Sequence, residues 1–248
     1  MPRKIKSVAR QSRRNERMRS RNDAHLHALN DNYKPQIQKR RDETITPLND
    51  AQRRYDVAFE TADIVFGVGP AGTGKTWFAA MRAAEALAAG EIKRIIITRP
   101  AVEAGESLGY LPGELDEKYE PYIRPLRDAF DEKFGPSHVD NMIKNGQIDV
   151  RPLAFLRGST IKDAWLLADE MQNATKPQFK MLLSRIGEGA KFVINGDPRQ
   201  TDLPPGTSGL MDAVNRLEPV TGVEVVKFYR EDIVRSGLCQ AVVEAYED

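Results

Sequence analysis

Continuous runs of apolar residues recur along the chain and are separated by segments of helical character. Uninterrupted runs are typical of strands buried on both faces, whereas half-exposed strands alternate between apolar and polar residues. Strands are therefore predicted at 63–68, 94–98, 165–169, 191–196 and 224–228, with 147–153 as a further candidate. Helices are predicted at 47–60, 75–89, 176–186, 207–217 and 236–246. This alternation favours an α/β domain whose central, mostly parallel sheet is flanked by helices.

Two segments depart from the alternation of strands and helices. Residues 99–145 are rich in Gly, Pro and charge, so we expect a long connection of the kind that usually carries function. Residues 1–45 show no apolar face and are expected to form a basic arm that is flexible or partly helical. The α/β domain is then expected over 46–248.

The stretch IVFGVGPAGTGKTWFAA, residues 64–80, carries the strongest chemical signal. Its central part matches G-x-x-x-x-G-K-[ST] between a predicted strand and a predicted helix. Glycines let backbone N–H groups turn towards a phosphate, and the N-terminus of the following helix adds partial positive charge. Lys75 can reach the β- and γ-phosphates, and the Thr76 hydroxyl can ligate Mg²⁺. We therefore predict a nucleotide site formed by Gly69, Pro70, Ala71, Gly72, Thr73, Gly74, Lys75, Thr76 and Trp77.

A second signal is the pair of acids that ends the apolar run in WLLADEMQN. In a parallel sheet the carboxyl ends of the strands carry the ligand site. Asp169 is expected to hold Mg²⁺, directly or through water, and Glu170 to polarise an attacking water as general base. A protein that only holds nucleotide needs the first acid but not the second, so the pair favours hydrolysis. Taken alone, two acids are also typical of a solvated strand end.

A third strand ends in FVINGDPRQTDLP, where Gln200 follows Asp197 by three residues. A polar side chain at this strand end is placed to sense a γ-phosphate and to respond to its loss. Without further context, an ordinary Gly-Asp-Pro turn explains the sequence better.

Charge is divided unevenly along the chain. Residues 1–43 contain 13 Lys and Arg against 5 Asp and Glu, a net charge of +8. Since the whole chain carries +1, the remainder carries −7. A basic arm on an acidic body favours an anionic partner, nucleic acid first. A solvated tail without a partner is equally compatible with the composition.

Signals for export, membranes and zinc are weak. No apolar stretch is long enough for a signal peptide or a membrane span, so no membrane partner is expected. Cys239 is the only cysteine, which excludes an internal disulfide and favours a cytoplasmic location. With three histidines and no second cysteine, a zinc site has little support.

Several motifs together resemble, in order, the PhoH family of phosphate-starvation-type ATPases. The similarity runs from about Pro47 to the C-terminus, and the block TRPAVEAGESLGYLPG is specific to that family. The family strand usually ends Leu-Asp-Glu-Ala-Gln-Asn, whereas Ala168 and Met171 stand here at the first and fourth of these positions. The basic arm lies outside the resemblance. The remaining matching motifs are GPAGTGKT, EKYEPYIRPLRDAF, PLAFLRGSTIKDAWLLADEMQN, INGDPRQTDLP and DIVRSGLCQAVVEAYED.

The resemblance implies a single RecA-like P-loop domain, ATP with Mg²⁺ as the nucleotide, and RNA or single-stranded DNA as a partner. It also implies a homo-oligomer in the form of a hexameric ring. By the same resemblance, Gln52 contacts adenine and Gln200 senses the γ-phosphate. Loops facing a nucleic acid strand would contain Thr98, Arg99, Arg157 and Thr160.

A single RecA-like domain has no second domain to supply an arginine finger, so we expect the finger from a neighbouring subunit. Arg235, in DIVR, aligns with an arginine-bearing family motif and is favoured over Arg230, Arg124 and Arg127.

Three functions therefore remain in view at this point. The first is a nucleic-acid-dependent, helicase-like ATPase. The others are a nucleotide-switched binding module and a P-loop kinase. A kinase would need a phosphoacceptor pocket and an Arg-rich lid, whereas the 99–145 segment is acidic. ATP hydrolysis is the safer expectation than unwinding, because a full superfamily 1 helicase needs two such domains.

Overall fold

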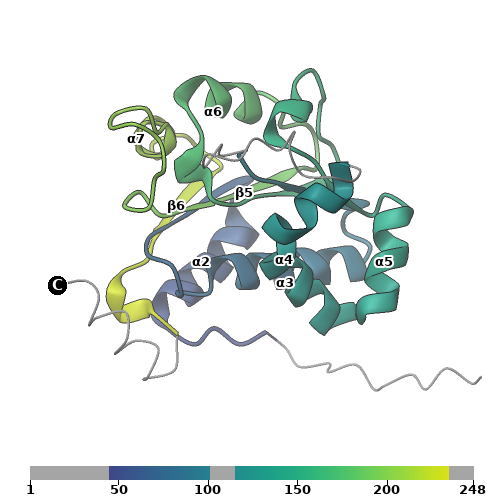
Figure 1. The fold of residues 1–248 in the computed structure, drawn as a ribbon. Coiled ribbons are helices and arrows are strands. Elements are labelled where there is room, and N and C mark those ends of the chain that lie inside the picture. The colour runs from purple at the N-terminus through teal and green to yellow at the C-terminus, as the bar shows by residue number, and fades with distance from the viewer. Residues whose placement is uncertain (1–44, 101–114, 235–248) are drawn as a thin grey trace, which may run out of the picture. The chain divides into compact units, whose positions relative to one another are not determined.

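The described part of the chain forms an α/β domain around one parallel sheet (Figure 1). The computed structural model describes residues 45–100 and 115–234, and for residues 115–122 only the backbone. All six strands are parallel, in the order β3-β2-β4-β5-β1-β6. This is the RecA-like architecture that the sequence predicted. The strands are β1 (Ile64–Val68), β2 (Arg94–Thr98), β3 (Ile148–Val150), β4 (Ala164–Ala168), β5 (Lys191–Gly196) and β6 (Val223–Lys227).

Helices cover both faces of the sheet (Figure 1). One face packs against α2 (Asp50–Thr61), α3 (Lys75–Ala88), α4 (Leu115–Phe134) and α5 (Pro136–Lys144). The other packs against α6 (Lys176–Leu183) and α7 (Leu210–Leu217). Short 3₁₀ turns are η2 (Leu153–Leu156), η3 (Met171–Asn173) and η4 (Arg230–Asp232). In the described ranges no helix is long and apolar enough to cross a membrane. The helix predicted at 236–246 lies outside the described residues.

Successive residues of the central strands are buried on opposite faces, which explains the continuous apolar runs. In β1, Val65 belongs to the core under α2 and α3, while Phe66 belongs to the core under α6 and α7. In β2, Ile95 and Ile97 face the first core and Ile96 the second. The centre of the sheet is therefore covered on both faces and has no solvated face.

The expectation of a long irregular connection at 99–145 is wrong for its second half. The chain from Leu115 to Phe134 is helical, and α5 follows it. Buried residues recur at helical spacing, at Ile123, Leu126, Phe130 and Phe134. Two prolines and many charges obscured this period in the sequence, and α4 accommodates Pro125 within its length.

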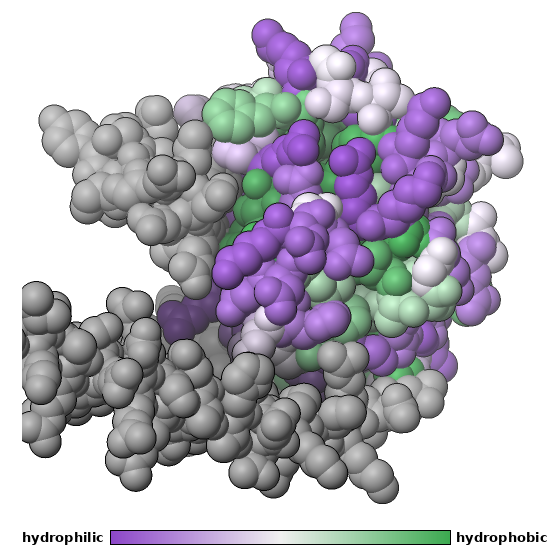
Figure 2. Space-filling view, turned by 90° about the vertical axis from the view of Figure 1, so that its right-hand side faces the viewer, coloured by the Kyte–Doolittle hydropathy of each residue, from purple (hydrophilic) through white to green (hydrophobic). Residues whose placement is uncertain are grey.

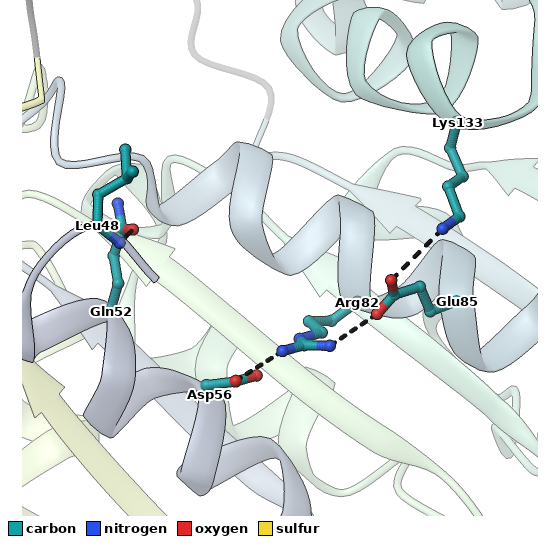
Figure 3. A network of polar contacts seen from close by, with 6 residues as sticks. All are labelled: Leu48, Gln52, Asp56, Arg82, Glu85 and Lys133. Carbon is teal, nitrogen blue, oxygen red and sulfur yellow. Dashed lines mark hydrogen bonds and ion pairs between the residues drawn. The ribbon is translucent and has the colours of Figure 1, made fainter. Parts of the chain in front are cut away.

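Charged side chains link the helices on the first face (Figure 3). Arg82 on α3 contacts Asp56 on α2 at 2.6 Å and Glu85 at 2.7 Å, and Glu85 contacts Lys133 on α4 at 3.4 Å. The outer surface of the described residues on the side of α5 is largely hydrophilic (Figure 2). The ion pairs thus join α2, α3 and α4 through partly exposed side chains.

Close packing at the middle of β1 fixes α2 against β5. The Tyr55 hydroxyl donates to Asn195 Oδ1 at 2.6 Å, and both groups are buried. A Cβ added at Gly67 would lie 2.5 Å from Asn195 Oδ1 and 2.9 Å from the Tyr55 oxygen. A residue without a side chain is therefore required between these two polar groups.

We predict that Gly67→Ala lowers the free energy of unfolding by about 1–3 kcal/mol, because the new methyl group overpacks a buried contact. Asn195→Ala removes the nearest obstructing atom. Chemical denaturation of the four proteins of the double-mutant cycle should show a smaller effect of Gly67→Ala in the Asn195→Ala background. Strict additivity would contradict the assigned contact.

Candidate active site

The predicted site residues converge on one cavity at the carboxyl ends of β1, β4 and β5. Its volume is about 250 Å³. The loop after β1, the acids after β4 and the turn after β5 all reach it because parallel strands end at the same edge of a sheet. The cavity is lined by Ala71, Gly72, Gly74, Lys75, Thr76, Trp77, Pro125, Asp169, Glu170, Gly196, Asp197 and Gln200.

The glycine loop turns into α3 through a left-handed residue. Gly74 has φ 81°, and α3 begins at Lys75. A Cβ at Gly74 would lie 2.8 Å from Nε2 of Gln52, so both the backbone angle and the close approach require glycine. Gln52 Nε2 also donates to the carbonyl of Thr73 at 3.0 Å. Helix α2 thus holds the glycine loop through the Gln52 side chain.

Lys75 is folded onto its own loop. Its ammonium donates to the carbonyls of Gly69 and Pro70 at 2.8 and 2.7 Å and to the Thr73 hydroxyl at 3.0 Å. Burial lowers the pKa of Lys75, while the charges of Asp197, Asp169 and Glu170 oppose that shift. Three weak acceptors therefore surround a charge that phosphate oxygens could bind more strongly.

Asp169 and Thr76 form the oxygen pair that the sequence assigned to a metal. The Thr76 hydroxyl donates to Asp169 Oδ1 at 3.0 Å. Burial raises the pKa of Asp169, and the neighbouring Glu170 adds to this, whereas Arg99 and the Thr76 hydrogen bond oppose it. Ionisation of Asp169 is therefore less favourable here than in water, and a nearby cation would offset this.

Glu170 has an unusual backbone conformation. Its φ is 54°, in the left-handed region that non-glycine residues seldom adopt. Arg99, which directly follows β2, lies with Nη2 3.4 Å from Glu170 Oε1. Gln172 Nε2 donates to Glu170 Oε2 at 2.5 Å. Such strain is found mainly where function requires it, and here it turns the carboxyl towards the cavity.

The turn after β5 is joined to the turn after β4. Gln172 Oε1 accepts from Asp197 N at 3.1 Å, and its Nε2 also donates to the Gln200 carbonyl at 3.3 Å. Asn173 accepts from Asp202 N at 2.8 Å and donates to the Asp202 carboxylate at 3.0 Å. Gln200 itself lines the cavity.

Four predicted residues lie beside the cavity and do not line it, namely Gln52, Gly69, Pro70 and Thr73. Gln52 is 3% exposed, and its Oε1 accepts from Leu48 N at 2.9 Å (Figure 3). An adenine contact would therefore use the second N–H and the second lone pair of this amide. Trp77 lines the cavity, and its indole N–H donates to Glu132 at 3.1 Å.

The residues expected to face nucleic acid are divided by the structure. Thr98 is 1% exposed, and its hydroxyl has no hydrogen-bond partner among the described residues. The buried Thr98 side chain is therefore not accessible to a nucleic acid strand, contrary to expectation. Arg157 and Thr160 are exposed, and Arg99 is partly exposed beside Glu170. Arg235 lies outside the described residues.

Sequence reasoning missed four contributors to the site: Arg99 as a partner of Glu170, Gln172, Asp197 and Pro125. The motif DEMQN contains a signal for Gln172, since its amide follows Glu170 by two residues and is close enough in sequence to hydrogen-bond that carboxylate. Nothing local to Pro125 pointed to the site, because α4 reaches the cavity only through the fold.

Comparison with known proteins identifies the family. A sequence model of the family described as "PhoH-like protein" matches residues 44–247. The chain belongs to the PhoH-like protein family. The "PhoH-like protein" of Bacillus subtilis is 49% identical over 197 residues, and "Protein PhoH" of Escherichia coli K12 is 44% identical over 205.

These alignments cover 79% and 82% of this chain but 62% and 58% of the two relatives. The chain thus spans about three-fifths of the length of these PhoH-like relatives. Among solved structures, the large terminase of a thermophilic bacteriophage is similar with a TM-score of 0.48 and 12% identity. That alignment covers 80% of this chain and 50% of the terminase.

The residues of this PhoH-like site fit a nucleotide with Mg²⁺. Backbone N–H groups, a buried ammonium and a helix N-terminus suit phosphate. A hydroxyl and a carboxylate 3.0 Å apart are hard oxygen ligands of the kind Mg²⁺ uses together with phosphate oxygens. The described residues contain no group of three or more His, Cys, Asp or Glu that could hold a metal without other ligands. A metal here would thus depend on the nucleotide.

We predict that Asp169→Asn leaves the melting temperature of the nucleotide-free protein unchanged or raises it. Because burial raises the pKa of Asp169, stability is lost as the pH rises from the ordinary carboxyl pKa to the raised one, and the amide removes this loss. Mg²⁺-dependent nucleotide affinity should fall in the same variant.

Thermal melts and nucleotide titrations with and without Mg²⁺ measure both effects. Asp128→Asn, on the exposed surface of α4, is the matched control and should change neither. A clear loss of stability in Asp169→Asn would contradict the assignment of Asp169 as an unfavourable charge.

Proposed function

We propose that this protein binds ATP with Mg²⁺ and hydrolyses it. The observation that carries the proposal is the convergence of Lys75, the Thr76–Asp169 pair and Glu170 on one cavity. A protein that only holds nucleotide needs Lys75, Thr76 and Asp169. A carboxylate beside them, held in a strained conformation, supports hydrolysis.

Each residue has a distinct role in the proposed reaction. Lys75 would leave its three loop acceptors and contact the β- and γ-phosphates. Glu170 would accept a proton from water as the water oxygen bonds to the γ-phosphorus and the bond to the β-phosphate oxygen breaks, releasing ADP and phosphate. Mg²⁺, when bound by Thr76 and Asp169, would offset negative charge on the phosphates. Gln200 would contact the γ-phosphate from the turn after β5.

We predict that Glu170→Gln retains ATP affinity but loses about 10²–10⁴-fold in turnover, because an amide of similar size accepts no proton from water. Lys75→Ala should instead abolish binding or turnover. Phosphate release and nucleotide titration separate the two effects. Glu91→Gln, at an exposed position away from the cavity, is the control. Normal turnover by Glu170→Gln would place the base elsewhere.

We further propose that RNA or single-stranded DNA binds this protein and stimulates hydrolysis. The arm of residues 1–43, with its net charge of +8, supports an anionic partner. Arg99, partly exposed and in contact with Glu170, offers a direct route from a bound strand to the base. A cytoplasmic location and a helicase-like activity are parts of the same proposal, which localisation in cells and a strand-unwinding assay would test.

We predict that single-stranded RNA or DNA raises the ATPase rate more than duplex does. Deleting residues 1–43 should reduce the salt dependence of nucleic-acid binding while leaving basal hydrolysis intact, since fewer counterions are released. The measurement is an ATPase scan over single strands and duplexes, with binding titrated against salt. Hydrolysis indifferent to every nucleic acid would favour a nucleotide-switched binding module instead.

We also propose that the protein acts as a homo-oligomer, a hexameric ring, in which Arg235 of one subunit serves the site of its neighbour. The support is the resemblance of DIVR to an arginine-bearing family motif. An arginine finger, which stabilises the charge that develops on the γ-phosphate, can be supplied by a neighbouring protein.

We predict that Arg235→Ala and Lys75→Ala subunits, each inactive alone, regain part of the activity when mixed. Some interfaces then pair an intact Lys75 site with an intact Arg235. The rate is measured after confirming co-assembly by size-exclusion chromatography of differently tagged subunits. No recovery in co-assembled mixtures would argue against a finger supplied in trans.

A further inference from the structure

The side chain of Gln172 is buried between the two catalytic turns. It is 1% exposed and lies in η3, directly after the acids that follow β4. Its Oε1 accepts from Asp197 N, and its Nε2 donates to Glu170 Oε2 and to the Gln200 carbonyl. All three partners line the nucleotide cavity. The amide is therefore satisfied entirely within the site.

The orientation of this amide follows from its partners. A backbone N–H can only donate, so the group facing Asp197 N must be the carbonyl oxygen of Gln172. The NH₂ group is then directed at Glu170 and the Gln200 carbonyl, which are both acceptors. Rotating the amide by half a turn would bring two donors together at one end and two acceptors at the other.

The backbone of β5 approaches this side chain closely. A Cβ at Gly196 would lie 3.0 Å from Gln172 Oε1 and 2.8 Å from Leu210. The amide is thus confined by packing as well as by hydrogen bonds. A confined amide transmits a displacement of one partner to the other two.

The carboxylate of Glu170 needs such a restraint. Glu170 lies between the end of β4 and the start of η3, in a left-handed conformation that non-glycine residues seldom adopt. Arg99, directly after β2, lies 3.4 Å from one carboxylate oxygen, and the pair is partly exposed. Gln172, whose side chain is buried, donates to the other oxygen at 2.5 Å. The contact with the amide is the shorter and more buried of the two.

We propose that Gln172 is a positioning residue that orients Glu170 and couples it to the turn carrying Gln200. This inference rests on the proposed function, in which Glu170 is the general base. Arrival or loss of the γ-phosphate at Gln200 would then move the base through Gln172. Gln172 itself does not line the cavity, so it would act through its partners.

The first test is the pH dependence of turnover in Gln172→Glu. A second carboxylate against Glu170 raises the pKa of the base, because two like charges at hydrogen-bond distance cannot both ionise easily. The acidic limb of the kcat profile should therefore move up by about one pH unit or more. Gln147→Glu, which adds the same charge at an exposed position, should leave the limb unmoved.

The second test is Gln172→Leu, an apolar side chain of similar size. The expected result is a fall in kcat of about 10- to 100-fold with KM and Mg²⁺–ATP affinity unchanged, since only the base is misplaced. Because Asp197 N loses its acceptor, some stability is lost as well. Turnover is therefore expressed per nucleotide-binding molecule, counted by titration.

The outcomes separate this inference from the proposed function. If the wild-type protein shows no hydrolysis, the proposed function fails. If Glu170→Gln hydrolyses normally, the base lies elsewhere and the inference about Gln172 fails with that assignment. If wild type hydrolyses and Glu170→Gln does not, but both Gln172 variants keep the wild-type kcat and acidic limb per binding molecule, Gln172 is only structural. That last result overturns the inference alone.

Discussion

The site depends on β5 lying hydrogen-bonded between β1 and β4. In this register Val68 is opposite Gly196, and Ala168 is opposite Ile194. Gly69 N extends the ladder by bonding the Gly196 carbonyl at 3.1 Å, just before the loop turns away. The glycine loop, the two acids and the turn after β5 therefore start within two hydrogen-bonded steps of one another. A slip of β1 would displace the loop from this turn, and a slip of β4 would displace the acids from it.

The charges that this register brings together are poorly stabilised by the protein alone. Burial lowers the pKa of Lys75 and raises that of Asp169, so each is less favourable when charged than it would be in water. Their mutual attraction offsets this only in part. In the proposed function a polyphosphate would partner Lys75 and a divalent cation would partner Asp169. The same burial would strengthen the interactions of both side chains with a charged ligand.

The sequence predicted five strands to within one residue, because continuous apolar runs have few alternatives in an α/β chain. The further candidate at 147–153 extends three residues past the end of β3. It also predicted Lys75, Thr76, Asp169 and Glu170, since strand ends and the glycine loop mark their positions locally. It did not predict α4, whose period is obscured by proline and charge. The roles of Arg99 and Gln172 were also missed, because each depends on which strands are neighbours in space.

Helix α2 precedes the glycine loop in sequence, yet it connects the parts of the site. Near its start, Gln52 holds the Thr73 carbonyl, and Asn49, its N-cap, donates to the Asp232 carbonyl in η4 at 3.0 Å. One turn further on, Tyr55 binds Asn195, the residue before Gly196. Helix α2 thus contacts the glycine loop, β5 and the chain after β6. The family match begins at residue 44, just before this helix, as expected if α2 is part of the nucleotide-binding core.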